Sequence, residues 1–453
     1  MNPSSSAFLT DLYQLTMLQG YFDAKMDRIA VFEFFVRRLP ANRNFLVSAG
    51  LDQVLDFLES FECTAQELGW LEASGNFSRE FVSHLRTTRF TGDVHAMPEG
   101  EIFFANEPIL RVTAPIAEAQ VVETRIVNLL HFQTLIASKA VRCAITAPGK
   151  ALVDFGLRRA HGAEAGLLAA RACYLTGFTA TSNVLAGQTY QIPLSGTMAH
   201  SFIQASDSEV EAFRRFALAN PNNVTLLLDT YDTEAAAEKV VQLAPTLKSQ
   251  GISIRGVRLD SGDLGEHARR VRRILDDGKL QEVSIFASGN LDEFELQRLV
   301  RSGAPIDGFG VGTRVLTSAD APYLDCAYKI QEYNGRPLRK LSEGKATWPG
   351  RKQVYRSYRS GRMESDVITL EDDKMPGEAL LQPVMRNGKR LRSNVTLFEI
   401  RQRVADQLRQ LPPGLLSLEC EEQHFPVSIS DSLQEMARNL SLAYASKNSR
   451  SSA

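Results

Sequence analysis

A series of short segments in the middle of the chain is rich in glycine and in polar or charged side chains, and each segment comes at the end of a predicted strand. These segments are Phe155–Arg159, Thr181–Asn183, Gly196–His200, Asp229–Asp232, Arg258–Asp263, Ala287–Asn290 and Gly310–Thr313. One such turn means little, because glycines and helix-capping residues are common where a strand leads into a helix. A whole series of them indicates a shared ligand site.

Three kinds of group recur in these segments, and together they indicate the ligand. Arginine forks bind carboxylate or phosphate, glycine-rich turns offer backbone N–H groups to phosphate, and aspartates bind Mg²⁺ or sugar hydroxyls. The arginines are Arg158, Arg159 and Arg258, the glycines are Gly289, Gly310 and Gly312, and the aspartates are Asp229, Asp260 and Asp263. A phosphorylated sugar with magnesium and a carboxylate-bearing partner fits this set. The alternative for each aspartate is a helix N-cap, above all for Asp263 and Asp292.

The segment Gly196–His200 adds an imidazole to these groups. A neutral histidine, common near pH 7, has a nucleophilic nitrogen. We predict that residues 190–194 form a strand leading into this segment and that a helix runs from about 204 to 218. A buried histidine held by a neighbouring hydroxyl is an equally good interpretation of the segment alone.

Alternating strands and helices must position these groups. Predicted strands cover 151–155, 224–228, 254–259, 283–287 and 308–312, and predicted helices cover 164–174, 233–247, 264–275 and 292–300. This alternation is typical of parallel sheets, whose ligands bind at the carboxyl ends of the strands. Both an open doubly wound sheet and a (β/α) barrel fit the pattern.

The flanking segments have a different composition. The N-terminal part has a predicted helix over 10–21, a strand over 29–36, further helices over 51–58, 65–71 and 80–85, a β-rich stretch over 92–115 and a long helix over 116–142. After residue 328, predicted strands and one helix over 397–408 lack a core of their own, so we expect them to pack on the N-terminal module. We therefore predict an N-terminal module over 1–145, an α/β unit with the active site over 146–328, a C-terminal segment over 329–430, and a helix end and flexible tail over 431–453.

Composition excludes several classes of protein. The 453 residues are 44% hydrophobic and carry 51 basic and 53 acidic side chains, a balance that argues against a broad nucleic-acid-binding surface. The cysteines show no CxxC spacing and no Cys/His cluster, so neither a disulfide framework nor a zinc site is expected; they are Cys63, Cys143, Cys173, Cys326 and Cys420. The N-terminus lacks the features of a secretory signal, and no apolar run approaches the roughly 20 residues of a membrane span. We expect a cytoplasmic protein with no membrane or nucleic-acid partner.

The ordered set of motifs resembles the nicotinate phosphoribosyltransferase family. The matching motifs are Thr10-Asp11-Leu12-Tyr13-Gln14, Phe155-Gly156-Leu157-Arg158-Arg159-Ala160, Gly196-Thr197-Met198-Ala199-His200-Ser201, Asp229-Thr230-Tyr231-Asp232-Thr233, Arg258-Leu259-Asp260-Ser261-Gly262-Asp263-Leu264, Gly310-Val311-Gly312-Thr313 and Lys340-Leu341-Ser342-Glu343-Gly344-Lys345. Each motif alone is weak, but their order over about residues 8 to 420 is specific.

The resemblance implies an α/β fold in which an irregular (β/α) barrel joins a smaller α/β domain formed from N- and C-terminal segments. It also implies transfer of 5-phosphoribose from phosphoribosyl diphosphate to the ring nitrogen of nicotinate, a step of NAD salvage. Mg²⁺ as cofactor, ATP as co-substrate and a homodimer with an active site shared across the interface belong to the same expectation.

The resemblance further assigns roles to individual residues. The expected catalytic residues are His200, transiently phosphorylated by ATP, Arg258 and Asp260; the expected nicotinate contacts are Tyr13 from the neighbouring subunit, Phe155, Arg158, Thr197 and Arg258. The expected phosphoribosyl and phosphate contacts are Asp229, Ser261, Gly262, Gly289, Asn290, Gly310, Gly312 and Thr313. Arg37 and Arg38 are weaker candidates for the diphosphate, and no protein ligand of the metal is assigned.

Three alternatives to the nicotinate enzyme stay open at this point. The first is the sister enzyme that uses nicotinamide, although an arginine near the ring suits a carboxylate better than an amide. The second is quinolinate phosphoribosyltransferase, which shares the architecture but does not need the histidine. The third is a non-catalytic metabolite-binding barrel.

Overall fold

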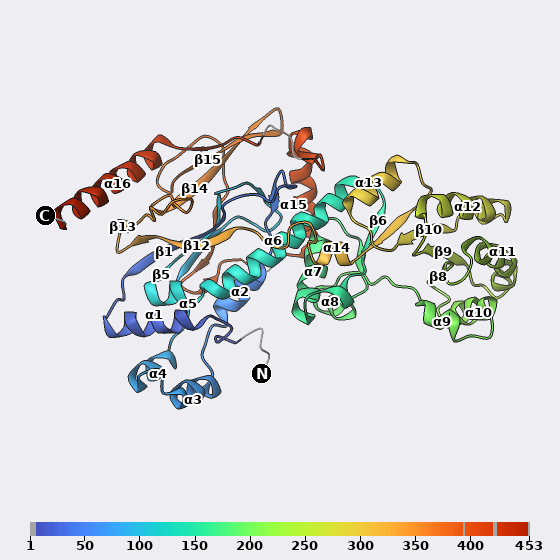
Figure 1. Ribbon diagram of the computed structural model, residues 1–453, viewed down its shortest axis with the longest axis horizontal. Helices are drawn as coiled ribbons and strands as arrows, with labels where there is room; N and C mark the ends of the chain where they lie inside the picture. Colours follow the sequence, from blue (N-terminus) through green and yellow to red (C-terminus); the bar gives the residue numbers. More distant parts are fainter. Residues whose placement is uncertain (1–5, 393–394, 420–423, 452–453) are drawn as a thin grey trace. The chain divides into compact units, whose positions relative to one another are not determined.

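The computed structural model describes residues 6–392, 395–419 and 424–451. The chain forms two compact units: unit 1 comprises residues 1–138 and 323–453, and unit 2 comprises residues 139–322 (Figure 1). Cys420 and both ends of the chain, residues 1–5 and 452–453, lie outside the described residues, and the other four cysteines are free thiols. In the part of the chain that the structure describes, no helix is long and apolar enough to cross a membrane.

Unit 2 alternates strands with helices. Its strands are β6 Ala151–Asp154, β7 Ala180–Thr181, β8 Val224–Leu227, β9 Ile254–Leu259, β10 Ser284–Ser288 and β11 Gly308–Val311. Its helices are the end of α6 Glu123–Thr146, η2 Leu157–Arg159, α7 Ala163–Leu175, α8 Val184–Tyr190, α9 His200–Gln204, α10 Glu209–Ala219, α11 Thr233–Ser249, α12 Leu264–Asp277, α13 Glu293–Arg301 and α14 Thr313–Leu316.

The strands of unit 2 form a curled parallel sheet. Their order is β7-β6-β11-β10-β9-β8, and the pairing of β6 with β11 brings the first strand beside the last. No ladder joins β7 to β8 in the described residues, so the sheet is a half-barrel that stays open at this seam. The carboxyl ends of all its strands lie on one edge because they run in the same direction.

Helix N-caps explain several of the aspartates in unit 2. Asp232, Asp263 and Asp292 accept hydrogen bonds from backbone N–H groups at the starts of α11, α12 and α13. Capping by the backbone N–H of Glu266 lowers the pKa of Asp263 below its ordinary value. The capping interpretation of Asp263 and Asp292 is therefore confirmed.

The predicted strand over 190–194 is wrong. The helix α8, capped by the side chain of Asn183, extends to Tyr190, and only Leu194 forms a bridge, with Thr181 of β7. This segment lies at the open seam of the sheet, where it has no second neighbouring strand to pair with. The predicted helix over 204–218 is present as α10, but it begins at Glu209 after the cap of Ser208, and Gln204 ends the short helix α9.

Unit 1 is built around an antiparallel sheet with strands from both ends of the chain. Its strands are β1 Ile29–Val36, β2 Leu46–Val47, β3 Asp93–Ala96, β4 Ile102–Phe103, β5 Pro108–Pro115, β12 Cys326–Tyr333, β13 Arg336–Pro337, β14 Lys352–Arg359, β15 Arg362–Leu370, β16 Glu378–Ala379, β17 Gln382–Arg386, β18 Lys389–Arg390 and β19 Val427–Ile429. The main sheet has the order β13-β12-β1-β5-β3-β17-β18, and a smaller one has the order β16-β14-β15-β19.

The helices of unit 1 are α1 Leu12–Asp23, α2 Leu51–Glu59, α3 Ala65–Ser74, α4 Arg79–Leu85, α5 Ile116–Val121, the first part of α6, α15 Leu397–Gln410, η3 Pro413–Leu416 and α16 Asp431–Ser451. The single helix predicted over 116–142 is thus two, α5 and α6. In the helix end and flexible tail predicted over 431–453, α16 is helical as far as Ser451. This stretch contains no glycine or proline, so no strong helix breaker ends the helix earlier.

A buried ion-pair cluster connects the two chain segments of unit 1. The guanidinium of Arg356 is fully buried and donates to Asp366 at 2.7 Å, to Glu101 at 2.7 Å and to the carbonyl of Ile102 at 2.8 Å. A buried charge is tolerated only when it is paired and hydrogen-bonded in this way. The cluster thereby fixes β14 and β15 against β4.

Candidate active site

A cavity of about 800 Å³ lies at the carboxyl-end edge of the unit 2 sheet. The residues that line it are Phe155, Leu157, Arg158, Arg159, Ser182, Gly196, Thr197, Met198, Ala199, His200, Arg258, Asp260, Ser288, Gly289, Asn290, Gly310, Gly312 and Thr313. They follow or end β6, β7, β9, β10 and β11, or belong to the segment before α9. Six of the seven segments predicted to share a ligand site therefore meet in one cavity, and the segment Asp229–Asp232 does not line it.

The cavity includes most of the residues selected from the sequence. Those that line it are Phe155, Arg158, Thr197, His200, Arg258, Asp260, Gly289, Asn290, Gly310, Gly312 and Thr313. Asp229, Ser261 and Gly262 do not line it, although Asp229 contacts one of its residues. Tyr13 lies in unit 1, on α1, where it is half exposed.

Arg258, on β9, is the centre of the hydrogen-bond network in the cavity. Its Nε donates to Ser288 Oγ at 2.8 Å, and its Nη2 donates to Asp260 Oδ1 at 2.8 Å. Its Nη1 donates to Thr197 Oγ1 at 3.1 Å and to the carbonyl of Met198 at 3.3 Å. The guanidinium thus joins β9, β10 and the segment before His200, and one of its five N–H groups has no acceptor in the described residues.

Phe155 forms an aromatic wall beside this guanidinium. The Arg258 guanidinium carbon lies 5.4 Å from the centre of the Phe155 ring, within the range of a cation–π interaction. A Cβ added to Gly310 would lie 2.4 Å from this ring, so only glycine allows the ring to occupy its position. The preceding residue, Asp154, accepts hydrogen bonds from the Gly156 N–H and the Thr181 hydroxyl, and burial raises its pKa.

His200 faces an acidic partner. Its Nε2 lies 3.5 Å from Oδ1 of Asp229, whose side chain is 3% exposed. The other oxygen of Asp229 accepts a hydrogen bond from the Ser261 hydroxyl at 2.5 Å, while Oδ1 is buried with no hydrogen-bond donor in the described residues. Asp229 therefore has one oxygen that is held in place and one that can accept a proton or bind a cation.

Arg158 and Arg159 give the cavity an excess of positive charge. Both are exposed on η2, and neither side chain has a hydrogen bond or ion pair within the described part of the chain. Asp260 already pairs with Arg258. Two arginines without protein partners beside an aromatic wall are suited to a ligand that carries carboxylate or phosphate groups.

The residues also fit a magnesium ion that arrives with a diphosphate. The described residues hold no group of three or more histidine, cysteine, aspartate and glutamate side chains suited to a metal. Mg²⁺ usually takes only one or two protein carboxylates, together with substrate phosphates and waters. The buried Oδ1 of Asp229 and the carboxylate of Asp260 are the available protein oxygens.

Gly289 offers a direct test of the cavity wall. Its φ is +106°, and an added Cβ would lie 2.1 Å from the carbonyl oxygen of Asp260. We expect Gly289→Ala to displace this turn and lower activity by at least about tenfold, because misplacing active-site groups is costly. The matched control is Gly303→Ala, which also has positive φ but no atom near its Cβ. Equal activity of the two variants in steady-state kinetics would contradict this role.

Sequence reasoning gave no role to Ser288, which lines the cavity. Its hydroxyl accepts from Arg258 and donates to Asp260, so it connects the two side chains. Ser288 stands in the polar segment after β10, but a serine there is also a common turn residue. Arg37 and Arg38, the weaker candidates in unit 1, both form ion pairs with Asp325.

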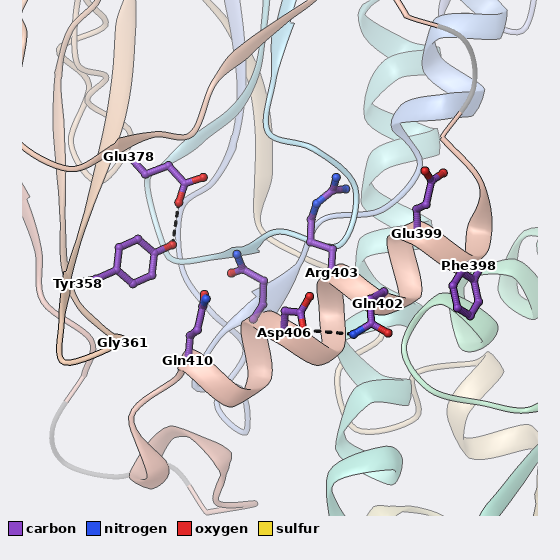
Figure 2. Close-up of a pocket in the computed structure, with 10 residues that line it drawn as sticks. Tyr358, Gly361, Glu378, Phe398, Glu399, Gln402, Arg403, Asp406 and Gln410 are labelled. Atoms are coloured by element: carbon purple, nitrogen blue, oxygen red, sulfur yellow. Dashed lines mark hydrogen bonds between the residues drawn. The ribbon is translucent and has the colours of Figure 1, made fainter.

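A second cavity, of about 620 Å³, lies along α15 in unit 1. Figure 2 shows that its polar side chains bond to one another: Tyr358 donates to Glu378 at 2.9 Å, and Gln402 donates to Asp406 at 3.2 Å. Glu399 accepts the backbone N–H of Thr396 at 2.7 Å. Each of these acids accepts a hydrogen bond from a neighbouring protein group, whereas the side chains of Arg158 and Arg159 in the unit 2 cavity have no partner in the described residues.

Comparison with known proteins places the chain in a family. Three models match it: the nicotinate phosphoribosyltransferase N-terminal domain over residues 8–131, the nicotinate phosphoribosyltransferase family over 150–342 and the C-terminal domain over 375–437. A nicotinate phosphoribosyltransferase of Mycobacterium tuberculosis is 47% identical over 95% of this chain and 93% of its own length. One of Bacillus subtilis is 38% identical over 82% of this chain and 78% of its own.

A solved structure agrees with these sequence matches. The human nicotinic acid phosphoribosyltransferase is similar with a TM-score of 0.86 and 29% identity, covering 96% of this chain and all of that one. The similarity extends over both units, so the fold and the order of the motifs agree with the same group of proteins.

Proposed function

Because the chain belongs to the nicotinate phosphoribosyltransferase family, we propose that it transfers 5-phosphoribose from phosphoribosyl diphosphate to nicotinate, forming nicotinate mononucleotide and diphosphate for NAD salvage. The observation that carries the proposal is the cavity of unit 2, where an aromatic wall, unpaired arginines and glycine-rich loops lie together. These are the groups that an aromatic carboxylate and a phosphorylated sugar require.

Nicotinate would bind beside Phe155 and Arg258. The Phe155 ring offers a face for the pyridine, and Thr197 is held by Arg258 at the same wall. The remaining N–H of Arg258 and the exposed Arg158 would bind the carboxylate. This excess of positive charge favours nicotinate over the neutral nicotinamide.

The phosphoribosyl group would bind at the loops after β10 and β11. Gly289, Asn290, Gly312 and Thr313 line the cavity there, and backbone N–H groups in such turns bind phosphate. Asp260 is placed to bind a ribose hydroxyl or the metal. Ser261 and Gly262 lie outside the cavity wall, so in this proposal they do not contact the substrate directly. Ser261 acts through Asp229, and Gly262 acts through the shape of the turn after β9.

The transfer itself is a displacement at C1 of the ribose. Diphosphate leaves as the C1–O bond breaks, the pyridine nitrogen gives its electron pair to C1, and the charge moves to the ring. No general base is needed, since that nitrogen carries no proton. The protein aligns the nitrogen with C1 and stabilises the leaving diphosphate with arginine side chains. A bound Mg²⁺ would add charge stabilisation on the diphosphate oxygens.

His200 would link the reaction to ATP. With Nε2–H turned toward Asp229, Nδ1 keeps its electron pair and can attack the γ-phosphorus of ATP, releasing ADP. The phosphohistidine would later be hydrolysed, and its role is energetic coupling rather than attack on the sugar. Asp229 orients the ring and stabilises its positive charge.

Tyr13 is proposed to reach the nicotinate site of a second copy of the chain in a cytoplasmic homodimer. It is 49% exposed on α1, which leaves its ring available to a partner. Mixing Tyr13→Ala protein with Arg258→Ala protein tests this. In each mixed dimer, one site would combine the intact Arg258 of one copy with the intact Tyr13 of the other. Activity no higher than that of the separate variants would contradict a shared site.

The function is tested by an assay of the pure protein with phosphoribosyl diphosphate and one pyridine at a time, with and without ATP. We expect nicotinate to be converted to its mononucleotide, faster with ATP, and nicotinamide and quinolinate to react poorly. Preferred turnover of either competitor would identify one of the other two enzymes. Binding of nicotinate without any turnover would favour a metabolite-binding protein.

A further inference from the structure

One side chain joins two of the loops that line the cavity. Arg314 lies on α14, directly after β11, and its Nε donates to Oδ1 of Asn290 at 3.1 Å. Its Nη1 forms an ion pair with Asp292. Arg314 is 44% exposed and does not line the cavity, whereas Asn290 does. The guanidinium therefore acts on the site through Asn290.

The Asp292 end of this connection is rigid. One oxygen of Asp292 caps α13 through two backbone N–H groups at 3.0 and 3.1 Å. The next residue, Glu293, is fully buried and pairs with Lys139 at 2.7 Å and Arg142 at 2.9 Å. The second oxygen of Asp292 thus gives Arg314 a fixed partner.

The Asn290 end has two possible orientations. An amide has an acceptor end and a donor end of nearly the same shape, and the guanidinium of arginine has only donors. Arg314 therefore selects the orientation in which the oxygen of Asn290 faces it. The amide nitrogen, which has no hydrogen-bond partner in the described residues, is the end that remains for a ligand. Without Arg314 the amide can turn and present its oxygen, which repels phosphate.

We propose that Arg314 is a positioning residue for phosphoribosyl diphosphate. By holding Oδ1 of Asn290, it keeps the amide N–H groups available to an oxygen of that substrate. The inference rests on the proposed function, which places phosphoribosyl diphosphate at the loops after β10 and β11.

The test is the kinetics of Arg314→Met in the full-length protein. We expect KM for phosphoribosyl diphosphate to rise about tenfold, the effect of losing one hydrogen bond to a charged group, while KM for nicotinate stays unchanged. Arg314→Lys keeps a cation beside Asp292 and is expected to recover part of the loss. The matched control is Arg298→Met, which removes another exposed arginine, paired with Glu295 on α13. Its kinetic constants should equal those of the wild type.

A double-mutant cycle separates positioning from loss of structure. Asn290→Ala should raise the same KM by a similar factor, and Arg314→Met combined with Asn290→Ala should add little, because both act through one amide. The inference would be overturned if the effects of the two substitutions multiplied in the double variant. An equal rise in KM for phosphoribosyl diphosphate and in KM for nicotinate would also overturn it. If Arg314→Met is unstable in thermal unfolding, the same cycle is measured with Arg314→Lys.

Failure of the proposal and failure of the proposed function give different results. An active wild-type protein whose Arg314 variants keep its KM for phosphoribosyl diphosphate contradicts the positioning role alone. A wild-type protein without turnover contradicts the proposed function, and the positioning role with it.

Discussion

Replacing Arg258 with alanine is expected to lower kcat/KM for nicotinate by about 100- to 1000-fold, the usual cost of removing one electrostatic group from an active site. The guanidinium makes four hydrogen bonds within the cavity and lies against the Phe155 ring. Its loss removes the positive charge beside the ring and releases Thr197 and Asp260 together. Steady-state kinetics with nicotinate as the varied substrate measure the effect.

Two further variants show whether activity depends on the planar set of N–H donors of Arg258 or only on its charge. Arg258→Lys keeps the charge but cannot make the same set of bonds, so we expect most of the activity to remain lost. Arg255→Lys changes an exposed arginine on the same strand and should be neutral. A fully active Arg258→Lys enzyme would show that charge alone suffices.

Replacing His200 with alanine is expected to abolish stimulation by ATP while leaving a slow transfer of phosphoribose. The cavity groups proposed to bind nicotinate and the diphosphate remain in this variant, but the nitrogen proposed to accept the phosphoryl group is gone. ATP hydrolysis and incorporation of acid-labile phosphate into the protein should both be lost. The comparison of rates with and without ATP measures the coupling directly.

The control for His200 is His161→Ala, which removes an exposed histidine of the same unit outside the cavity. It should keep both labelling and ATP stimulation. Asp229→Asn should slow labelling without abolishing it, since the asparagine still faces the ring but carries no charge. Full ATP stimulation of the His200→Ala enzyme would rule out the phosphohistidine.

The strands of unit 2 could be predicted because their signal is local. Val224–Leu227 is a short and largely buried run in a parallel sheet, Ile254–Leu259 buries its apolar residues Val257 and Leu259, and the helix between these strands begins at the cap of Asp232. The segment between α8 and α9 could not be predicted in this way. This segment lies at the open seam of the sheet. Whether it forms a strand there depends on whether the tertiary structure supplies a neighbouring strand, and not on the residue pattern.

The cavity was predictable as a set of loops but not as a set of contacts. All parallel strands end on one edge, so the polar segments had to meet. Which residues touch depends on the register of neighbouring strands: Phe286 pairs with Arg258, and this places Ser288 within reach of the guanidinium. The contact between His200 and Asp229 likewise joins residues that are not neighbours in the sequence.

The strand order of unit 1 has a consequence for biosynthesis. β1 pairs with both β5 and β12, so Ala30 has Ala114 on one side and Tyr333 on the other. All of unit 2 leaves the ribosome before β12 does, and it can fold while one edge of β1 is still unpaired. An open strand edge is a template for association with other chains. The interval between the synthesis of β1 and that of β12 is therefore the stage at which the edge of β1 is open to association with other chains.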